Sequence, residues 1–249
     1  MNVSLKLIRI LILLLCVLFG IASCRRPIAT MDSGFKSTKA YELILSFDPA
    51  TILNDIANGT VDFTLLEESR FGEEPGGDPS YWSQAEYYTI LSRAFEFAWQ
   101  EDPLDFRISV VDLETSCQNM DKGFSWAYFQ FYRLSENVSV RAYRSVLIQP
   151  TYSEISLVSA EHYPSGRGYF VDSYIEPGAL TAEEALAIAE KAGGIDYRNR
   201  VGNRCMLDVV FTSNRKFDGW RIAYDGGGNP PVLTIIVNEQ SGAYEIIQE

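Results

Sequence analysis

The sequence predicts an α+β fold made of two units, each a capped helix packed on an antiparallel sheet. The first observation is that two amphipathic helices each begin with a capping box, one at Ser83 and one at Thr181. The second is that runs of alternating apolar and polar residues, separated by short turns, follow each helix. Such alternation is typical of antiparallel strands with one buried face, for which a helix is the natural cover. We place one domain at residues 41–178 and another at residues 179–249.

Residues 1–23 have the layout of a bacterial signal peptide. Two basic residues precede an apolar run over residues 10–21, which is shorter than the roughly 20 residues that a membrane-spanning helix needs. The run ends at Ile21-Ala22-Ser23-Cys24, which resembles the lipobox of bacterial lipoproteins. That resemblance implies cleavage before Cys24 and acylation of this residue, with enough acyl chain for stable anchoring. An uncleaved anchor, or a plain secretory signal followed by a chance cysteine, is the alternative.

The charge of the chain limits its partners. It has 21 Lys plus Arg against 33 Asp plus Glu, and cleavage removes Lys6 and Arg9 but no acid, so the formal charge falls from −12 to −14. We therefore expect no nucleic-acid partner. The expected location is the extracytoplasmic side of the bacterial cell membrane, through the lipid anchor and a tether over residues 24–40. The sequence leaves open whether the inner or the outer membrane holds it.

The first domain opens with short elements. Residues 41–47 alternate as a strand, and Asp48-Pro49 supplies an N-cap and a proline at the first position of a short helix. A second strand is expected at residues 61–66. The loop at residues 71–80 is rich in glycine, proline and acid, but its carboxylates lack the spacing of a calcium-binding loop. These carboxylates belong to Glu73, Glu74 and Asp78.

The long helix of the first domain starts at Ser83-x-x-Glu86 and runs to about Trp99. Its apolar residues recur on one face at helical spacing. They are Tyr87, Ile90, Leu91, Ala94 and Ala98. Five strands are expected after it, at residues 106–115, 124–134, 138–149, 153–163 and 169–175.

The second domain repeats this order. Thr181-x-x-Glu184 is its capping box, and Gly193-Gly194 is expected to end its helix. The strands that follow are expected at residues 205–212, 219–224, 232–238 and 243–247. Their short turns predict an antiparallel meander.

The second domain also resembles a known family. Its alanine-rich helix, the strand around Trp220 and the terminal hairpin over residues 233–246 are similar to a PepSY domain. In the hairpin, Asn238 and Ser241 stand where the family has Asp and Thr. The resemblance covers residues 180–247 and implies a non-catalytic domain that restrains or regulates envelope peptidases. The first domain is interpreted as a diverged copy, with Trp126 in the place of Trp220.

Two cysteines remain in the mature chain besides the lipidated one. Cys117 and Cys205 each lie in a strand region after one capped helix, so a disulfide between them would join the two units. Closing a loop of roughly 90 residues would stabilise the fold by about 4 kcal/mol. Two free buried thiols are the alternative, because sequence does not give the distance between them.

Little in the sequence is typical of catalysis. His162 is the one histidine, which disfavours a histidine-rich zinc site and a Ser-His-Asp arrangement. Glu183 and Glu184 occupy the first turn of a helix, where the helix dipole accounts for them. The paired Glu67 and Glu68 have no catalytic context. We therefore expect no catalytic residue, no cofactor and no metal, so that the protein is no enzyme; a hydrolase with unrecognised carboxylates is the remaining alternative.

The sequence thus predicts a lipid-anchored, non-enzymatic binding or regulatory module whose partner is an envelope peptidase or a peptide segment. The hairpin at residues 232–247 is the candidate sheet edge, because an extended peptide can add to an edge through backbone hydrogen bonds. Tyrosines 163, 169 and 174 flank a loop and are assigned to packing, with the rim of a binding groove as the alternative. The alternative function is a structural or assembly lipoprotein that packs on a membrane-protein partner.

Overall fold

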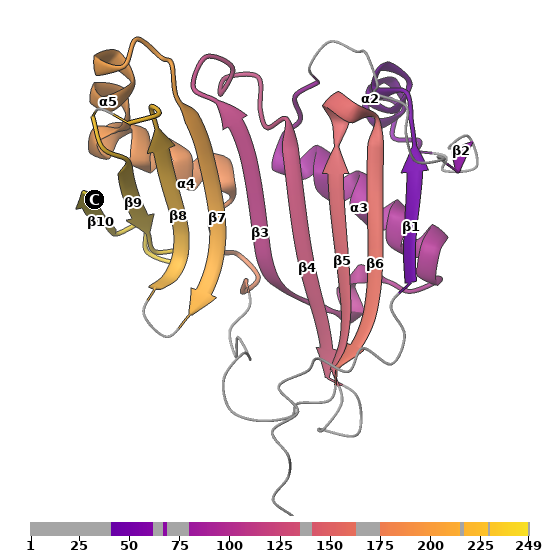
Figure 1. Cartoon of the computed structure of the whole chain (residues 1–249). Coiled ribbons are helices and arrows are strands. Elements are labelled where there is room, and N and C mark those ends of the chain that lie inside the picture. The colour runs from indigo at the N-terminus through magenta and orange to yellow at the C-terminus, as the bar shows by residue number, and fades with distance from the viewer. Residues whose placement is uncertain are drawn as a thin grey trace, which may run out of the picture.

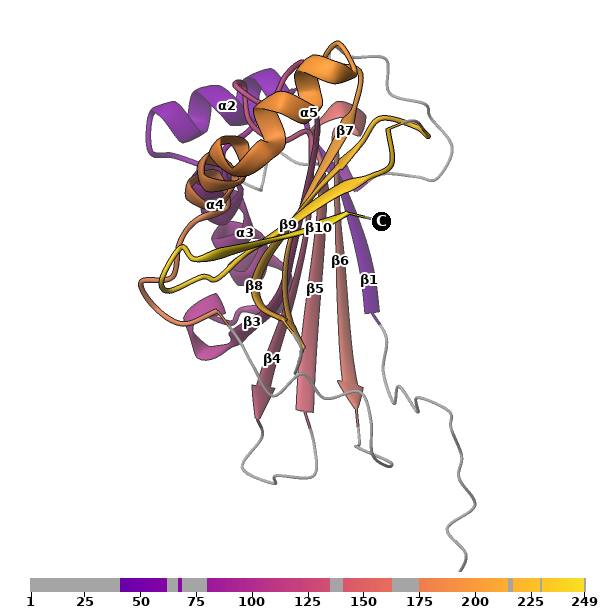
Figure 2. The ribbon, with the colours of Figure 1, turned by 90° about the vertical axis from the view of Figure 1, so that its left-hand side faces the viewer.

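The computed structural model describes residues 41–61, 67–68, 80–134, 141–162, 175–214, 217–228 and 230–248. Over these residues the fold is α+β, as predicted. Its strands form one antiparallel sheet in the order β10-β9-β8-β7-β3-β4-β5-β6-β1-β2. The labelled helices lie on one face of this sheet and leave the other face uncovered (Figures 1 and 2). We call these the helix face and the open face.

The elements alternate between sheet and helix along the chain. The first half contains β1 (Tyr41–Ser46), α2 (Pro49–Ala57), β2 (Glu67–Glu68), α3 (Gln84–Trp99), η2 (Pro103–Asp105), β3 (Arg107–Ser116), β4 (Trp126–Leu134), β5 (Arg141–Gln149), η3 (Pro150–Tyr152) and β6 (Glu154–His162). The second half contains α4 (Ala182–Ala189), the π-turn η4 (Glu190–Gly194), α5 (Ile195–Arg200), β7 (Met206–Asn214), β8 (Phe217–Asp225), β9 (Leu233–Val237) and β10 (Tyr244–Gln248).

Both predicted capping boxes are confirmed. The Glu86 backbone N–H donates to the Ser83 hydroxyl (3.3 Å), and the Ser83 N–H donates to the Glu86 carboxylate (2.6 Å). The same exchange joins Thr181 and Glu184, at 3.2 and 2.8 Å. Each box satisfies N–H groups that a helix start leaves without partners, so both helices begin where the sequence predicts.

The helix that begins at Thr181 is interrupted at Gly193, as the sequence predicts, because the backbone leaves the helical conformation there. The sequence does not predict the second helix, α5, which starts directly after this kink and runs to Arg200. Gly193 adopts a φ of 152°, which absorbs the kink. A Cβ on Gly194 would overlap the Tyr224 hydroxyl, so glycine at this position permits close contact between the kink and the sheet.

The two predicted units share one sheet rather than forming separate ones. β3 and β7, the first strand after each long helix, pair antiparallel with Leu113 opposite Val209. From this junction β4, β5 and β6 follow on one side, and β8, β9 and β10 on the other. Pairing β3 with β7 leaves neither strand as an exposed edge.

The core lies between the helices and the helix face. Along β3, the odd-numbered residues from Ser109 to Thr115 are buried and the even-numbered ones are partly exposed. On α3 the buried stripe contains Tyr87, Ile90, Leu91, Ala94 and Phe95. The predicted apolar face of this helix is therefore its packed face.

Trp126 is not the structural counterpart of Trp220. Trp220 is fully buried on the helix face, where its indole N–H donates to the Leu180 carbonyl (2.9 Å). Trp126 pairs with Glu114 and is partly exposed on the open face, where its ring stacks with that of Tyr128 (6.5 Å between centroids).

Several predicted features lie outside the described residues. They are the signal peptide, the tether with Cys24, most of the strand at 61–66, the loop at 71–79, the strand at 169–174 and the three tyrosines assigned to packing. Within the described part, none of the helices combines the length and the apolar character needed to cross a membrane.

Candidate functional site

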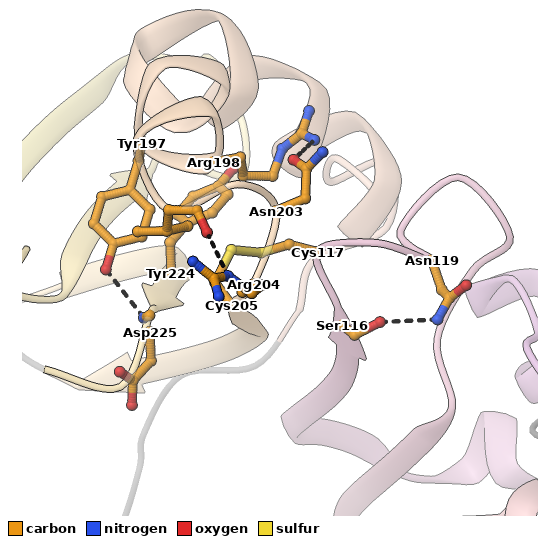
Figure 3. The surroundings of a disulfide bond; sticks show 12 residues. Ser116, Cys117, Asn119, Tyr197, Arg198, Asn203, Arg204, Cys205, Tyr224 and Asp225 are labelled. Carbon is orange, nitrogen blue, oxygen red and sulfur yellow. Dashed lines mark hydrogen bonds between the residues drawn. A yellow bond between two sulfur atoms is a disulfide. The ribbon is translucent and has the colours of Figure 1, made fainter. Parts of the chain in front are cut away.

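The structure brings Cys117 and Cys205 together as a disulfide. Their sulfur atoms are 1.99 Å apart and their Cα atoms 5.3 Å apart, across 88 residues of chain. Cys117 directly follows β3 and Cys205 directly precedes β7, so the bond lies at one end of the junction strands (Figure 3). The backbone N–H of Cys117 also donates to the Cys205 carbonyl (2.8 Å). The bond thus links the two halves where their strands begin to pair.

Two of the four glutamates considered for acid–base roles, Glu183 and Glu184, cap helix starts. Glu184 completes its capping box, and the Glu183 carboxylate accepts the backbone N–H of Gln84 (2.6 Å). Glu67 and Glu68 form the two-residue strand β2 beside β1. His162 is the last residue of β6, opposite Arg141.

A carboxylate cluster on the open face was missed by the sequence analysis. Glu114 of β3 lies opposite Asp208 of β7, and Asp112 is two residues away on the same face. Arg221 of β8 forms an ion pair with Asp208. Burial raises the pKa of Asp112 to about 7, and the charge and hydrogen bond of Asp208 add to the shift. Burial and the charge of Asp208 raise the pKa of Glu114 as well.

This cluster has no metal-binding geometry. Among the described residues, no group of three or more His, Cys, Asp or Glu side chains is placed to hold a metal ion. The alternation along β3 already predicts that Asp112 and Glu114 share a face. The neighbouring Asp208 and Arg221 come from strands about 100 residues further along the chain, and no local pattern signals that pairing.

The strand β10 forms one end of the sheet and is the candidate binding site. Among the described strands it pairs with β9 alone, with Tyr244 opposite Val237 and Ile246 opposite Ile235. In Figure 2 this edge of the molecule faces the viewer. The predicted terminal hairpin is thus an edge hairpin. An edge strand presents unpaired backbone groups to which another extended chain can add.

The turn that leads into β10 is held by one side chain. The Asn238 side-chain oxygen accepts the backbone N–H groups of Gln240 (3.2 Å) and Ser241 (2.9 Å), and the Ser241 hydroxyl (2.8 Å). Gly242 follows with a φ of 69°, and a Cβ there would lie 3.1 Å from the Ile188 side chain of α4. The hydrogen bonds hold the shape of the turn, and Gly242 places the turn close to α4.

The edge strand carries apolar side chains that its neighbours do not cover. Tyr244 is 55% exposed and Ile246 is 44% exposed, whereas their partners Val237 and Ile235 are fully buried. All four lie on the helix face, so the buried row of β9 continues into an exposed row on β10. Glu245, between the two apolar residues, is exposed and points to the opposite face.

Comparisons with known proteins give little further information. No protein-family model matches the sequence. No curated protein matches it either. A crystal structure of a predicted lipoprotein (CD1622) from Clostridium difficile 630 superposes with a TM-score of 0.41 at 12% identity, over 70% of this chain and 96% of that chain. A TM-score this low does not establish a shared fold, and the PepSY resemblance and the lipobox remain predictions from the sequence.

Proposed function

We propose that the chain is a lipid-anchored lipoprotein on the extracytoplasmic side of a bacterial membrane, where it acts as a non-enzymatic binding module. The lipobox ending at Cys24 supports the anchor. The Cys117–Cys205 bond supports the location, because disulfides persist in oxidising compartments outside the cytoplasm.

The observation that carries the binding role is the one-sided pairing of β10 beside exposed Tyr244 and Ile246. A free edge with uncovered apolar side chains favours association with another extended chain, through backbone hydrogen bonds and apolar burial together. The PepSY resemblance suggests that the partner is an envelope peptidase and that binding modulates its activity.

The negative charge of this chain implies that the proposed partner has a basic surface. With a formal charge of −12 before processing, the chain attracts basic surfaces and repels acidic ones. Association with a basic partner weakens as the salt concentration rises from low to physiological, because ions screen exposed charges.

The proposed function is tested by co-purification from the native membranes. A tagged full-length chain is recovered in mild detergent at low and at physiological salt, with an untagged strain as control. Recovery of a peptidase, whose activity then changes on adding the purified lipoprotein, supports regulation. Recovery of no partner at either salt concentration contradicts the binding function.

An assembly lipoprotein is the second candidate function. It is favoured by the open face, on which no described helix packs and on which the stacked rings of Trp126 and Tyr128 are only half-buried. A sheet face that no described helix covers suits packing against a membrane-protein partner. In the same co-purification, a stoichiometric complex without peptidase activity supports assembly instead of regulation.

A further inference from the structure

The backbone groups at the free edge include those of two residues with exposed apolar side chains. The Asn238 N–H donates to the Ala243 carbonyl (2.8 Å), which makes these two residues a hydrogen-bonded pair. Hydrogen-bonded and non-hydrogen-bonded pairs alternate along an antiparallel ladder. Glu245 and Ile247 therefore direct their backbone groups toward β9, and Tyr244 and Ile246 direct theirs to the free edge.

An added strand would continue the apolar row on the helix face. Residues placed opposite Tyr244 and Ile246 point their side chains to the same face as these two. That face also carries Ile188 of α4, which contacts the turn at Gly242. Apolar side chains at alternate positions of the added strand would bury the exposed surface of Tyr244 and Ile246. Polar side chains there would leave that apolar surface in contact with water.

On its opposite face, the β10 edge carries a negatively charged side chain. Glu245 is exposed there and lies opposite Ile236, an uncharged residue. A basic side chain on the added strand would lie next to Glu245, and cross-strand pairs of opposite charge are favourable while like charges are not. A second copy of this chain would bring its own Glu245 and its own net negative charge to the contact, so self-association is disfavoured.

We propose that the β10 edge selects an extended segment of a partner protein that alternates apolar residues, facing the helices, with basic residues, facing Glu245. This inference rests on the proposed binding function and specifies the partner segment for it. In that segment, apolar residues such as valine strictly alternate with basic residues such as lysine.

The test measures binding of fluorescent peptides to the lipidated full-length chain in nanodiscs by anisotropy. The probes are TVKVKVT, the block-ordered TVVVKKT of the same composition, and the acidic TVEVEVT. We expect the alternating basic peptide to bind at least tenfold more tightly than either of the others. Equal affinity for the alternating and block-ordered peptides would overturn the inference.

Two variants locate the binding at this edge. Ile246→Pro removes an N–H that points away from β9, so the strand keeps its ladder and loses a group needed for addition; we expect at least tenfold weaker binding with an unchanged melting temperature. Glu245→Lys, which leaves the backbone intact, should reverse the preference toward TVEVEVT. Unchanged peptide binding in both variants contradicts the inference.

The same variants separate this inference from the proposed function. If the native partner co-purifies equally with the wild-type chain and with Ile246→Pro, the binding function stands and the edge is not its site. If no partner co-purifies with either, the binding function itself fails, whereas loss of the partner only in the proline variant supports both.

Discussion

The backbone N–H of Gln84 donates to the Glu183 carboxylate at 2.6 Å, across 99 residues of chain. In return, the side-chain oxygen of Gln84 accepts the backbone N–H of Ala182 at 2.6 Å. The first turns of α3 and α4 therefore cap each other where the two halves of the molecule meet. Each contact satisfies an N–H that its own helix leaves without a partner. The helix layer is thus joined at this point, as the sheet is joined by β3 and β7.

Removing the side chain of Gln84 should destabilise the whole fold. Gln84 is only 5% exposed, so Gln84→Ala leaves the buried Ala182 N–H without its acceptor. An unsatisfied buried group of this kind costs about 1–3 kcal/mol. We expect that decrease in the free energy of unfolding, measured by urea denaturation of the mature chain.

The matched control is Glu96→Gln on the same helix. The Glu96 side chain is 71% exposed and makes a surface ion pair with Arg93, so its loss should change stability by less than about 0.5 kcal/mol. Equal effects of the two substitutions would show that the contact between the helix starts contributes nothing.

Breaking the disulfide should also destabilise the fold. Cys117 and Cys205 close a long loop across the junction, and such a cross-link contributes about 4 kcal/mol through the entropy of the unfolded chain. The double variant Cys117→Ser with Cys205→Ser should unfold at clearly lower urea concentration than the oxidised wild type. Its migration on a non-reducing gel should match that of the reduced protein, and faster migration of the variant would argue against the bond.

The lipid anchor is tested at Cys24. If the lipobox is processed as the sequence predicts, Cys24→Ala abolishes labelling with a fatty-acid probe and leaves an uncleaved precursor. The variant Cys16→Ala, within the signal peptide, should label like wild type. A Cys24→Ala chain that still incorporates the probe rules out anchoring at this residue.

The features of this fold that can be predicted from the sequence are those formed by residues close together along the chain. Ser83 and Glu86 are three residues apart, so their capping box is visible in the sequence and forms as predicted. The pairing of β3 with β7 depends on two strands about 100 residues apart, and alternation along each strand says nothing of its neighbour. For this reason the sequence predicts the two capped helices and many of the strands, but not the single sheet in which those strands pair.

The separation of residues along the chain also explains which parts of the candidate sites can be predicted from the sequence. The terminal hairpin is local, and its turn residues Asn238 and Gly242 mark it plainly. The carboxylate cluster is not local, because Asp208 reaches Asp112 only through the β3–β7 pairing. Trp126 and Trp220 occupy similar places in their sequence motifs, but the register of β4 places Trp126 on the open face of the sheet, whereas Trp220 of β8 lies on the helix face.

The carboxylate cluster should make the fold more stable in mild acid than in mild base. Burial and, after it, the charge of Asp208 raise the pKa of Asp112 from its ordinary value of 3.8 to about 7 in the folded protein. The folded state therefore binds a proton more tightly than the unfolded state, and stability falls as the pH rises from about 4 through 7. Because the cluster is partly open to solvent, we expect a loss on the order of 1 kcal/mol from this group.

Asp112→Asn tests this origin directly. The amide stays neutral at every pH, so the variant should be more stable than wild type at pH 8, similar to it at pH 4.5, and less dependent on pH between these values. Glu96→Gln, an exposed carboxylate outside the cluster, serves as the control and should leave the profile unchanged. The measurement is the urea midpoint at pH values from 4.5 to 8, together with the carboxyl ¹³C titration of Asp112. A midpoint near pH 4 for that carboxyl, or a wild-type pH profile in Asp112→Asn, would contradict the assignment, because the proton would then be held elsewhere in the cluster.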